Sequence, residues 1–459
     1  MKIKSVEKLS FGLPERYPMT RVETYQNRIK IVVQKMHEQS INFLILYSDR
    51  EHSANQEFLI GVGPRFEESL LIISDTEELI LLHGNECAFL APDTDLNVQM
   101  KLFQDFSPMG QQRNNSQNLM EIFKEIGIKR GSSVGVVGWK SYQQKLFPNQ
   151  KSIIDVPTYI IDDLRTLIGD VNKVSNEGNI FYNPDNGLRI ICSSDEIAQF
   201  EYSARVVSNA VQTFLDKLEI NKSERSFEKY LDSFGLPLSC HKMISFGDKV
   251  KRGLTSPGDG LSQIGTPAMV ALGVSGALTA RAGMLAHENK ELHENIQSFY
   301  EEFSANYWIS IITWYENLKI GASGGEIFSK VSEKINSKLF NLMLNPGHNL
   351  HIEEWSNSIF SYGNEATLKS GMVLQSDLIP VSNGPFCYSN AEDGVAIGDE
   401  ALRNELRQKY PEMWNRILSR KEFIHKALGI QLDDSVLPLS DMCCYYAPYM
   451  LSPEAIYVK

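Results

Sequence analysis

The chain has 459 residues, a formal net charge of -12, 42% hydrophobic residues and 22% charged residues. This composition is that of a folded globular protein and excludes the disordered and fibrous classes. The length favours two domains over one. The acidic balance, with no stripe rich in Lys or Arg, excludes a general nucleic-acid-binding protein, because such a protein must neutralise phosphates.

Neither a membrane anchor nor a secretory leader is expected. No apolar run approaches the roughly eighteen residues needed to cross a bilayer, and residues 1–5 lack the apolar core of a signal peptide. The six cysteines are scattered and show no zinc-knuckle spacing. A reducing, cytoplasmic location with free thiols is therefore predicted, with no membrane and no nucleic acid among the partners.

The first third of the chain alternates helix and strand. Thr20 and Glu23 form a candidate capping box for a helix, and apolar residues at helical spacing follow as far as Met36. Strands are expected at 43–47, 69–74, 78–82 and 133–138, with a helix at 119–126. These elements predict an α/β domain over residues 1–185, ending in a polar stretch rich in Asn and Gly.

A second domain is expected over residues 186–459. Capping boxes at Ser193/Glu196 and Ser323/Glu326 predict two of its helices. An aromatic-rich helix at about 291–316 should bury Trp308 in the core, and Trp314 with it. The chain should end in a helix at 402–428 and an apolar, Tyr-rich tail that packs as a strand.

Three motifs of the second domain point to a polar site. They are 347–354 (GHNLHIEE), 371–377 (GMVLQSD) and 390–395 (NAEDGV). Each places a His or a carboxylate beside an apolar or Gly-rich run, as in a site set on strands and turns. In contrast, the chain has no aspartate between Asp259 and Asp377.

The order and spacing of these motifs resemble the aminopeptidase P, prolidase and creatinase family. The resemblance covers nearly the whole chain. It implies an α+β fold, with an N-terminal creatinase-like α/β domain followed by a catalytic-type domain of the "pita-bread" fold that carries a C-terminal helix and tail. It also implies a homodimer.

In active peptidases the resemblance would imply two divalent metals, commonly manganese, cobalt or zinc. Two aspartates, one histidine and two glutamates would hold them. Bridging carboxylates keep two cations close, so that a shared water loses its proton near neutral pH and both metals stabilise the tetrahedral intermediate.

Matching this sequence to the family pattern places apolar residues where the aspartates belong. Ala271, within 269–273 (MVALG), takes the place of the first aspartate. Counting back from Arg281 puts Leu278 in the place of the second, and a shift of the gap would move that place to Ala280. No aspartate is available in either alignment.

Other positions of the family site are kept. His348 matches the histidine ligand, Asp377 stands at the first glutamate and Glu392 at the second. These three could hold one metal in an open site, although a two-metal clamp lacks its bridging carboxylate. Trp355 occupies the place of a second, proton-handling histidine. Together with Arg281, these residues predict a pocket for a small polar or cationic ligand.

The sequence thus favours a pseudopeptidase, a non-hydrolytic protein that binds a small peptide or a small polar or cationic molecule and needs no cofactor. Two alternatives stay open. One is a metal-independent C–N hydrolase resembling creatinase. The other is an Xaa-Pro aminopeptidase with an altered metal site that holds one divalent ion of Mn, Co or Zn. The sequence is thus compatible with a binding protein and with an enzyme.

Overall fold

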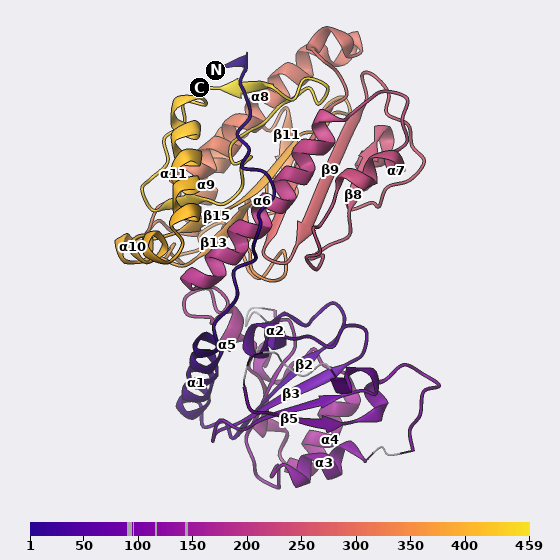
Figure 1. The fold of residues 1–459 in the computed structure, drawn as a ribbon, viewed down its shortest axis with the longest axis vertical. Helices are drawn as coiled ribbons and strands as arrows, with labels where there is room; N and C mark the ends of the chain where they lie inside the picture. The colour runs from indigo at the N-terminus through magenta and orange to yellow at the C-terminus, as the bar shows by residue number, and fades with distance from the viewer. Residues whose placement is uncertain (90–93, 95, 115–116, 143–145) are drawn as a thin grey trace. The chain divides into compact units, whose positions relative to one another are not determined.

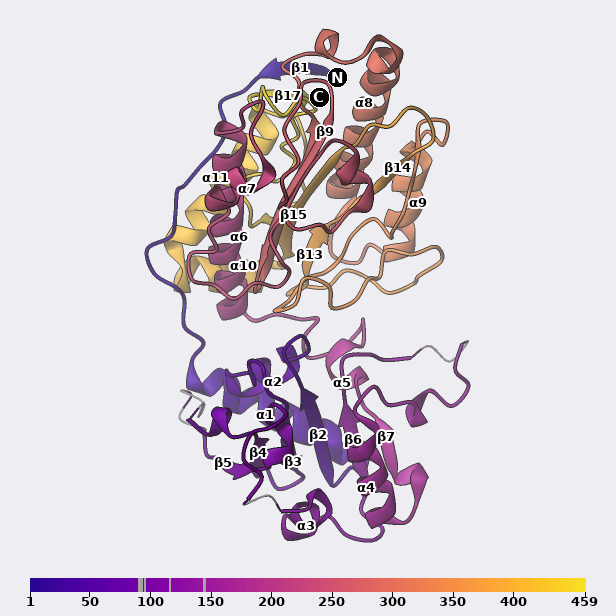
Figure 2. The same ribbon diagram turned by 90° about the vertical axis from the view of Figure 1, so that its right-hand side faces the viewer.

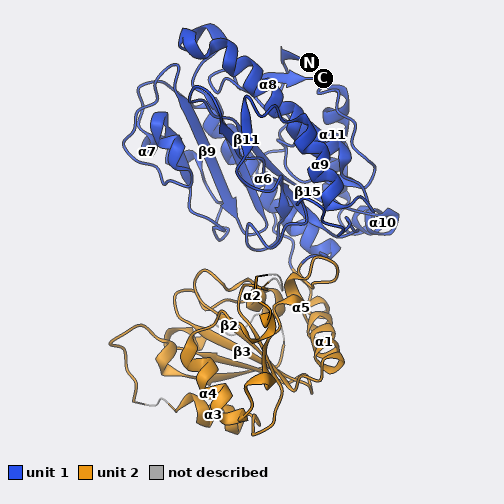
Figure 3. Ribbon diagram, turned by 180° about the vertical axis from the view of Figure 1, so that it is seen from behind, with its two compact units in different colours: residues 1–19, 190–459 blue, residues 20–189 orange. Residues whose placement is uncertain are grey.

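The computed structural model describes residues 1–89, 94, 96–114, 117–142 and 146–459. The chain forms two compact units, shown in different colours in Figure 3. The small unit spans Thr20–Arg189, and the large unit combines Met1–Met19 with Ile190–Lys459. In the described part of the chain, no helix is both long enough and apolar enough to cross a membrane.

The small unit is built on one mixed sheet of six strands. Its order is β5-β4-β3-β2-β6-β7, and β2 pairs antiparallel with β3 but parallel with β6. The strands are β2 (Phe43–Ser48), β3 (Ser69–Ser74), β4 (Leu79–His83), β5 (Val98–Leu102), β6 (Val134–Val137) and β7 (Val174–Asn176). The helices are α1 (Val22–Glu38), α2 (Ala54–Ile60), α3 (Leu119–Glu125), α4 (Thr158–Ile168) and α5 (Asn179–Tyr182).

The predicted start of the first helix was wrong. Helix α1 begins at Val22 with Arg21 as its N-cap, and no side chain bonds the cap. Strands β3 and β4 are nearly continuous apolar runs in which every position is buried, as expected for strands covered on both faces.

The large unit contains a seven-stranded sheet of order β12-β13-β15-β10-β9-β8, with β16 also paired to β15. Its strands are β8 (Met243–Phe246), β9 (Pro267–Val274), β10 (Ala277–Met284), β12 (His348–Asn349), β13 (Val373–Ser376), β15 (Asn390–Ile397) and β16 (Val436–Pro438). A separate pair joins β11 (Phe340–Leu342) to β14 (Pro380–Ser382). The helices are α6 (Ser194–Asp216), α7 (Glu224–Phe227), α8 (Glu294–Asn317), α9 (Gly324–Lys334), α10 (Glu400–Lys409) and α11 (Pro411–Lys426).

The two faces of this sheet have different neighbours. Side chains alternate between faces along a strand, so Val270 and Leu272 of β9 join the main core beneath α6, which packs on β9 and β10 (Figure 1). Met269 and Ala271 belong to a separate apolar cluster on the other face. That second face carries the candidate site.

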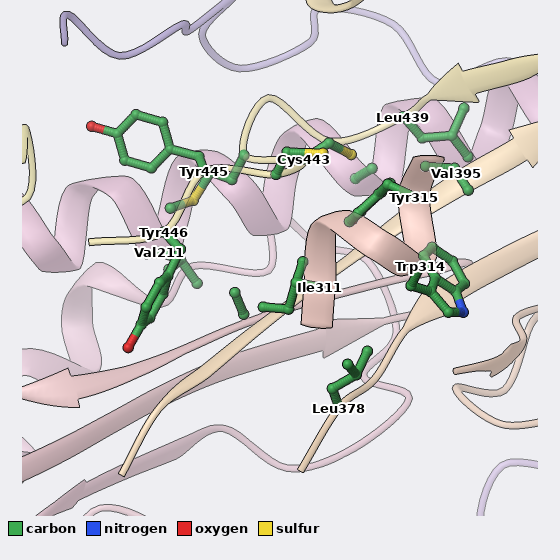
Figure 4. Packing of buried hydrophobic residues seen from close by; sticks show 14 of the residues in the cluster. Val211, Ile311, Trp314, Tyr315, Leu378, Val395, Leu439, Cys443, Tyr445 and Tyr446 are labelled. Atoms are coloured by element: carbon green, nitrogen blue, oxygen red, sulfur yellow. The ribbon is translucent and has the colours of Figure 1, made fainter. Parts of the chain in front are cut away.

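The main core is dominated by the aromatic side chains of α8. Trp308 and Trp314 are fully buried, as the sequence predicted. Figure 4 shows Trp314 and Tyr315 among buried residues from α6, β15 and the C-terminal segment. Both predicted capping boxes are present, at Ser193/Glu196 for α6 and at Ser323/Glu326 for α9.

The N-terminal residues belong to the large unit, which corrects the predicted domain of residues 1–185. β1 (Lys2–Ser5) pairs antiparallel with β17 (Ala455–Val458), so the two termini lie side by side (Figure 2). The backbone N–H of Phe11 also donates to Asp441 at 3.0 Å. The sequence pattern does not predict this pairing, because the periodicity of a segment shows that it is a strand but not which distant strand it pairs with.

The predicted helix 402–428 is two helices. α10 ends at Lys409 and α11 begins at Pro411. Tyr410 between them has φ -133° and ψ 60°, since a residue before proline is driven out of the helical region. The tail at 441–450 forms turns and a bridge rather than the expected strand, although almost all of it is buried.

A buried ionic network ties α6 to α11 and to the C-terminal segment. Glu201 of α6 accepts a bidentate pair from Arg416 at 2.8 and 2.7 Å, and it also accepts from Arg420 at 2.8 Å. Arg420 in turn donates to Asp441 at 2.8 Å. Glu201, Arg420 and Asp441 are all buried, so each charge depends on its partners for compensation.

The tight turn between β9 and β10 sets the register of both strands. Gly276 in this turn has φ +85°, and a Cβ there would lie 2.2 Å from the ring of Phe200. We expect Gly276→Ala to lower the free energy of unfolding by about 2–3 kcal/mol, from strain and overpacking together. Gly321 also has positive φ but open space around it, so Gly321→Ala should cost about 1 kcal/mol. Urea unfolding of both variants measures the two losses of stability. Equal losses would show that the contact with Phe200 adds nothing to the cost of the substitution.

Candidate functional site

A cavity of about 650 Å³ lies on the second face of the large unit's sheet. Four residues form one row across neighbouring strands β8, β9, β10 and β15: Met243 pairs with Ala271, Ala271 with Ala280, and Ala280 with Glu392. All four line the cavity. Because paired residues point to the same face, one carboxylate stands in this row beside two methyl groups and a thioether.

The positions matched to the family aspartates lie in this wall. Ala271 is in the row, and its direct partner on β10 is Ala280. Leu278 lines the cavity as well, but it pairs with Gly273, one step further along the same face. The pairing therefore favours Ala280, the alternative that a gap shift allowed, as the residue opposite Ala271.

Three carboxylates gather at one end of the cavity. Glu392 comes from β15, Asp377 directly follows β13, and Glu354 lies in the loop after β12. Glu392 accepts a hydrogen bond from the Asn390 amide at 2.7 Å. The Asp377 Oδ1 atom is buried and has no hydrogen-bond partner. The first two stand at positions that the sequence predicted for the site. Glu354 belongs to the 347–354 motif and reaches the cavity through the path of its loop.

Burial and repulsion between carboxylates raise the pKa values of Asp377 and Glu392. Burial raises the pKa of Asp377 well above its ordinary value, and the nearby Glu392 and Glu354 carboxylates raise it further. The pKa of Glu392 is also raised, first by burial and then by Glu354, with the Asn390 hydrogen bond acting in the opposite direction. Clustered like charges in a desolvated place favour protonation.

His348 lies behind the cavity wall. Its ring is fully buried and stacks on Trp355, with ring centroids 4.1 Å apart and an angle of 22° between the planes. Its Nε2 atom is 2.9 Å from Glu354 Oε1 and 3.8 Å from Asp377 Oδ2. Nε2 nevertheless makes no well-directed hydrogen bond, so Glu354 is a close neighbour of the ring and not a hydrogen-bond partner. Trp355 covers the ring and lines the cavity itself.

Arg281 is not where the sequence analysis placed it. It neighbours Ala280 on β10, so its side chain points to the opposite face of the sheet. There it forms a buried ion pair with Asp393 at 2.6 Å and donates to the backbone carbonyls of Met442 and Tyr445. Arg281 is therefore a structural residue that anchors the C-terminal segment, and it is absent from the cavity wall.

Most of the cavity wall is apolar, in contrast to the polar pocket that was expected. The wall includes a cluster formed mainly by small and flexible apolar side chains, with two aromatic rings beside it: Met243, Val250, Met269, Ala271, Leu278, Ala280, Phe386 and Tyr388. Methionine adapts its shape to different partners. The volume falls in the range of small-molecule sites.

The thiols of the wall are not poised as nucleophiles. Burial raises the pKa of Cys240 to about 12, and Glu354 and Glu392 act in the same direction. Burial likewise raises the pKa of Cys387 to about 12. A nucleophilic cysteine needs a lowered pKa, because the thiolate is the reactive form.

Another group of possible metal donors lies away from the cavity. Among the described residues, one set of three has donor atoms within 4.8 Å of one another, namely Cys192, Glu196 and His351. His351 Nε2 is 3.1 Å from Glu196 Oε1, and the other Glu196 oxygen accepts from the N-cap Ser193. The set thus already serves the start of α6. His351 stands near His348 in the 347–354 motif, but it belongs to this separate group.

Solved structures resemble this chain over most of its length. The prolidase from Pyrococcus horikoshii OT3 is 17% identical, with a TM-score of 0.61, and the match covers 81% of this chain and 95% of that chain. The Xaa-Pro dipeptidase from Bacillus anthracis is 13% identical, with a TM-score of 0.60, covering 82% and 96%. A variant of Escherichia coli aminopeptidase P is 13% identical, with a TM-score of 0.57, covering 85% and 100%.

The chain has the Xaa-Pro peptidase fold. The predicted α+β, pita-bread architecture is thereby confirmed. No protein-family model matches this sequence, and no curated protein matches it. At these identities the likeness concerns the fold alone. The residues of the cavity determine what this chain can bind or catalyse.

Proposed function

We propose that this chain is a binding protein built on the Xaa-Pro peptidase fold, whose cavity holds a small molecule without hydrolysing it. The observation that carries the proposal is the row across the sheet. Ala271 and Ala280 stand beside Glu392, where a pair of metal-bridging carboxylates would be needed. Methyl groups cannot ligate a cation.

The remaining donors do not fit a two-metal centre. Glu392 and Asp377 are oxygen donors of the cavity, but the residue paired with Glu392 on β10 is Ala280, and Leu278 of the same strand is an apolar part of the wall. Placing a divalent ion against such a wall would strip its hydration without replacing it. His348, the expected nitrogen ligand, is covered by Trp355. We therefore propose that the cavity holds no resident Mn, Co or Zn.

The alternative of a metal-independent C–N hydrolase is less well supported. Such chemistry needs a histidine that reaches the substrate to move a proton. His348 is fully buried and does not line the cavity, and Trp355 stands at the place where the family has a second histidine. The nearby thiols are held protonated as well. A panel of guanidino compounds and amides, assayed with chelator present, tests this alternative.

We expect the purified protein to retain less than stoichiometric metal after incubation with MnCl₂, CoCl₂ or ZnCl₂ followed by desalting. We expect no release of the N-terminal residue from Xaa-Pro peptides under the same conditions. Elemental analysis and an amino-acid release assay measure the two outcomes. Stoichiometric metal together with turnover that disappears in His348→Ala would overturn the proposal and favour an altered peptidase.

Assembly and location belong to the same proposal. We propose a homodimer, as the resemblance implies, and light scattering of the purified protein tests it. We also propose a cytoplasmic location, which agrees with six free cysteines. A reducing compartment keeps such thiols unpaired. The partner that we propose is a small molecule, rather than nucleic acid or a membrane.

A further inference from the structure

The acidic end of the cavity lacks a counter-charge. Glu354, Asp377 and Glu392 all line it, and no lysine or arginine among the described residues forms an ion pair with them. The nearest base is the covered His348, at 2.9 Å from Glu354 and 3.8 Å from Asp377. Asp377 and Glu392 also hydrogen-bond to each other, but this bond brings no positive charge to the group.

One oxygen of this group is unsatisfied. Asp377 is 5% exposed, and its Oδ1 atom has no hydrogen-bond partner. A buried acceptor without a donor costs free energy, and the cost is larger for a charged group. The residue lines the cavity, so a donor inside the cavity is the natural means of satisfying it.

The rest of the wall determines what kind of molecule can carry this hydrogen-bond donor. It is formed by methionines, short aliphatic side chains and the rings of Phe386 and Tyr388, with Trp355 beside the acidic end. An apolar group gains from leaving water for such a surface, and aromatic rings attract cations. The wall has two basic residues, Lys251 and Arg252, and both are exposed. Lys251 is 2.7 Å from Asp248 and lies over the Phe386 ring.

We infer that the cavity binds an organic cation, an amine or guanidine carried on an apolar body, with its charged end between Asp377, Glu392 and Glu354. This inference rests on the proposed binding function and specifies its ligand class. N–H groups of the cation donate to Asp377 and Glu392 as charge-assisted hydrogen bonds, while the body lies on the apolar cluster. Anions are excluded by repulsion. Neutral analogues fill the same wall but leave the carboxylates unpaired.

Matched probes of one shape test this inference. Calorimetric titration of the full-length protein would use phenylbutylamine, phenylbutanol, phenylbutyrate and, separately, MnCl₂. We expect the amine to bind about tenfold or more tightly than the alcohol, since charge-assisted hydrogen bonds are worth that much, and the acid not to bind. Glu392→Gln should remove the preference for the amine while leaving alcohol binding nearly unchanged.

Three further variants control for misfolding, for non-specific charge effects and for the place of binding. Asp377→Asn should weaken amine binding in the same sense, which covers a failure of Glu392→Gln to fold. The control Glu365→Gln changes an exposed carboxylate and should leave every titration unaltered. Ala280→Leu narrows the cavity and should weaken amine and alcohol alike, which locates both probes there.

The outcomes separate the inference from the proposed function. Equal affinity for amine and alcohol, or no binding of the amine, overturns the inference while the binding role stands. An amine preference that survives in both Glu392→Gln and Asp377→Asn overturns it too. Saturable Mn²⁺ binding with Xaa-Pro hydrolysis overturns the inference and the proposed function together.

Discussion

Glu201→Gln is expected to lower the free energy of unfolding by about 3–5 kcal/mol, the range for breaking a buried ion pair. The substitution keeps the shape of the side chain but removes the charge that Arg416 and Arg420 share. Arg420 is buried and would be left with Asp441 alone. Urea unfolding at neutral pH measures the loss.

An exposed pair on the same helix supplies the control. Glu422 and Lys426 form an i,i+4 pair in solvent, so Glu422→Gln should change stability little. If both variants unfold at the same urea concentration, the network does not stabilise the fold.

The stabilisation that Glu201 provides should disappear at acidic pH. Burial acts to raise its pKa, but Arg420 and Arg416 outweigh burial and the pKa is lowered. A carboxyl whose folded pKa lies below its unfolded one stabilises the fold above the unfolded value, and that stabilisation is lost as the pH falls through the folded value. The difference between wild type and Glu201→Gln should therefore shrink below about pH 4.3. A difference that is constant with pH would contradict this reading.

Introducing two carboxylates into the cavity wall is expected to create a metal site. In the double variant Ala271→Asp/Ala280→Asp, adjacent aspartates would stand in one row with Glu392. Without metal the variant should be less stable than wild type, because more like charges crowd a buried place. With Mn²⁺ at about 100 times its Kd, it should recover about 2.7 kcal/mol. Thermal unfolding with and without MnCl₂ measures both effects.

The register provides a sharp control for this experiment. Ala271→Asp/Leu278→Asp follows the alignment counted from Arg281, yet Leu278 pairs with Gly273 rather than with Ala271. It should bind Mn²⁺ more weakly than the first variant. Peptide hydrolysis should stay absent in both, since Trp355 still covers His348. Equal rescue of wild type by Mn²⁺ would show that the native cavity already holds the metal.

Much of the fold could be predicted from local pattern. The capping boxes at Ser193 and Ser323 and the buried Trp308 and Trp314 follow from spacing and residue type, and the structure contains all of them. The break at Pro411 also had a local signal, a proline inside a helical stretch, which the periodicity of the neighbouring residues concealed. The pairing of β1 with β17 had no such signal, because its two strands lie at opposite ends of the chain.

The residues of the candidate site also fall into those that local motifs predict and those that depend on the tertiary structure. The missing aspartates, His348, Asp377 and Glu392 can be read from motifs. The position of Arg281 could not, because the choice between two faces of a strand depends on which face the core helix α6 covers. Glu354 could be assigned to the 347–354 motif but not to the cavity wall, since a loop outside regular structure has no periodicity that tells where its side chains point.

By itself, the sequence determined the family-like order of elements and the absence of aspartates, since both are properties of residue type and spacing. Only the tertiary structure decided what surrounds the positions matched to the family's metal ligands. It set Ala271 and Ala280 beside Glu392, placed Trp355 over His348 and left Asp377 without a donor against an apolar wall. These relations join strands and loops far apart in the chain, and strand register and burial, which fix them, arise only when the sheet is assembled.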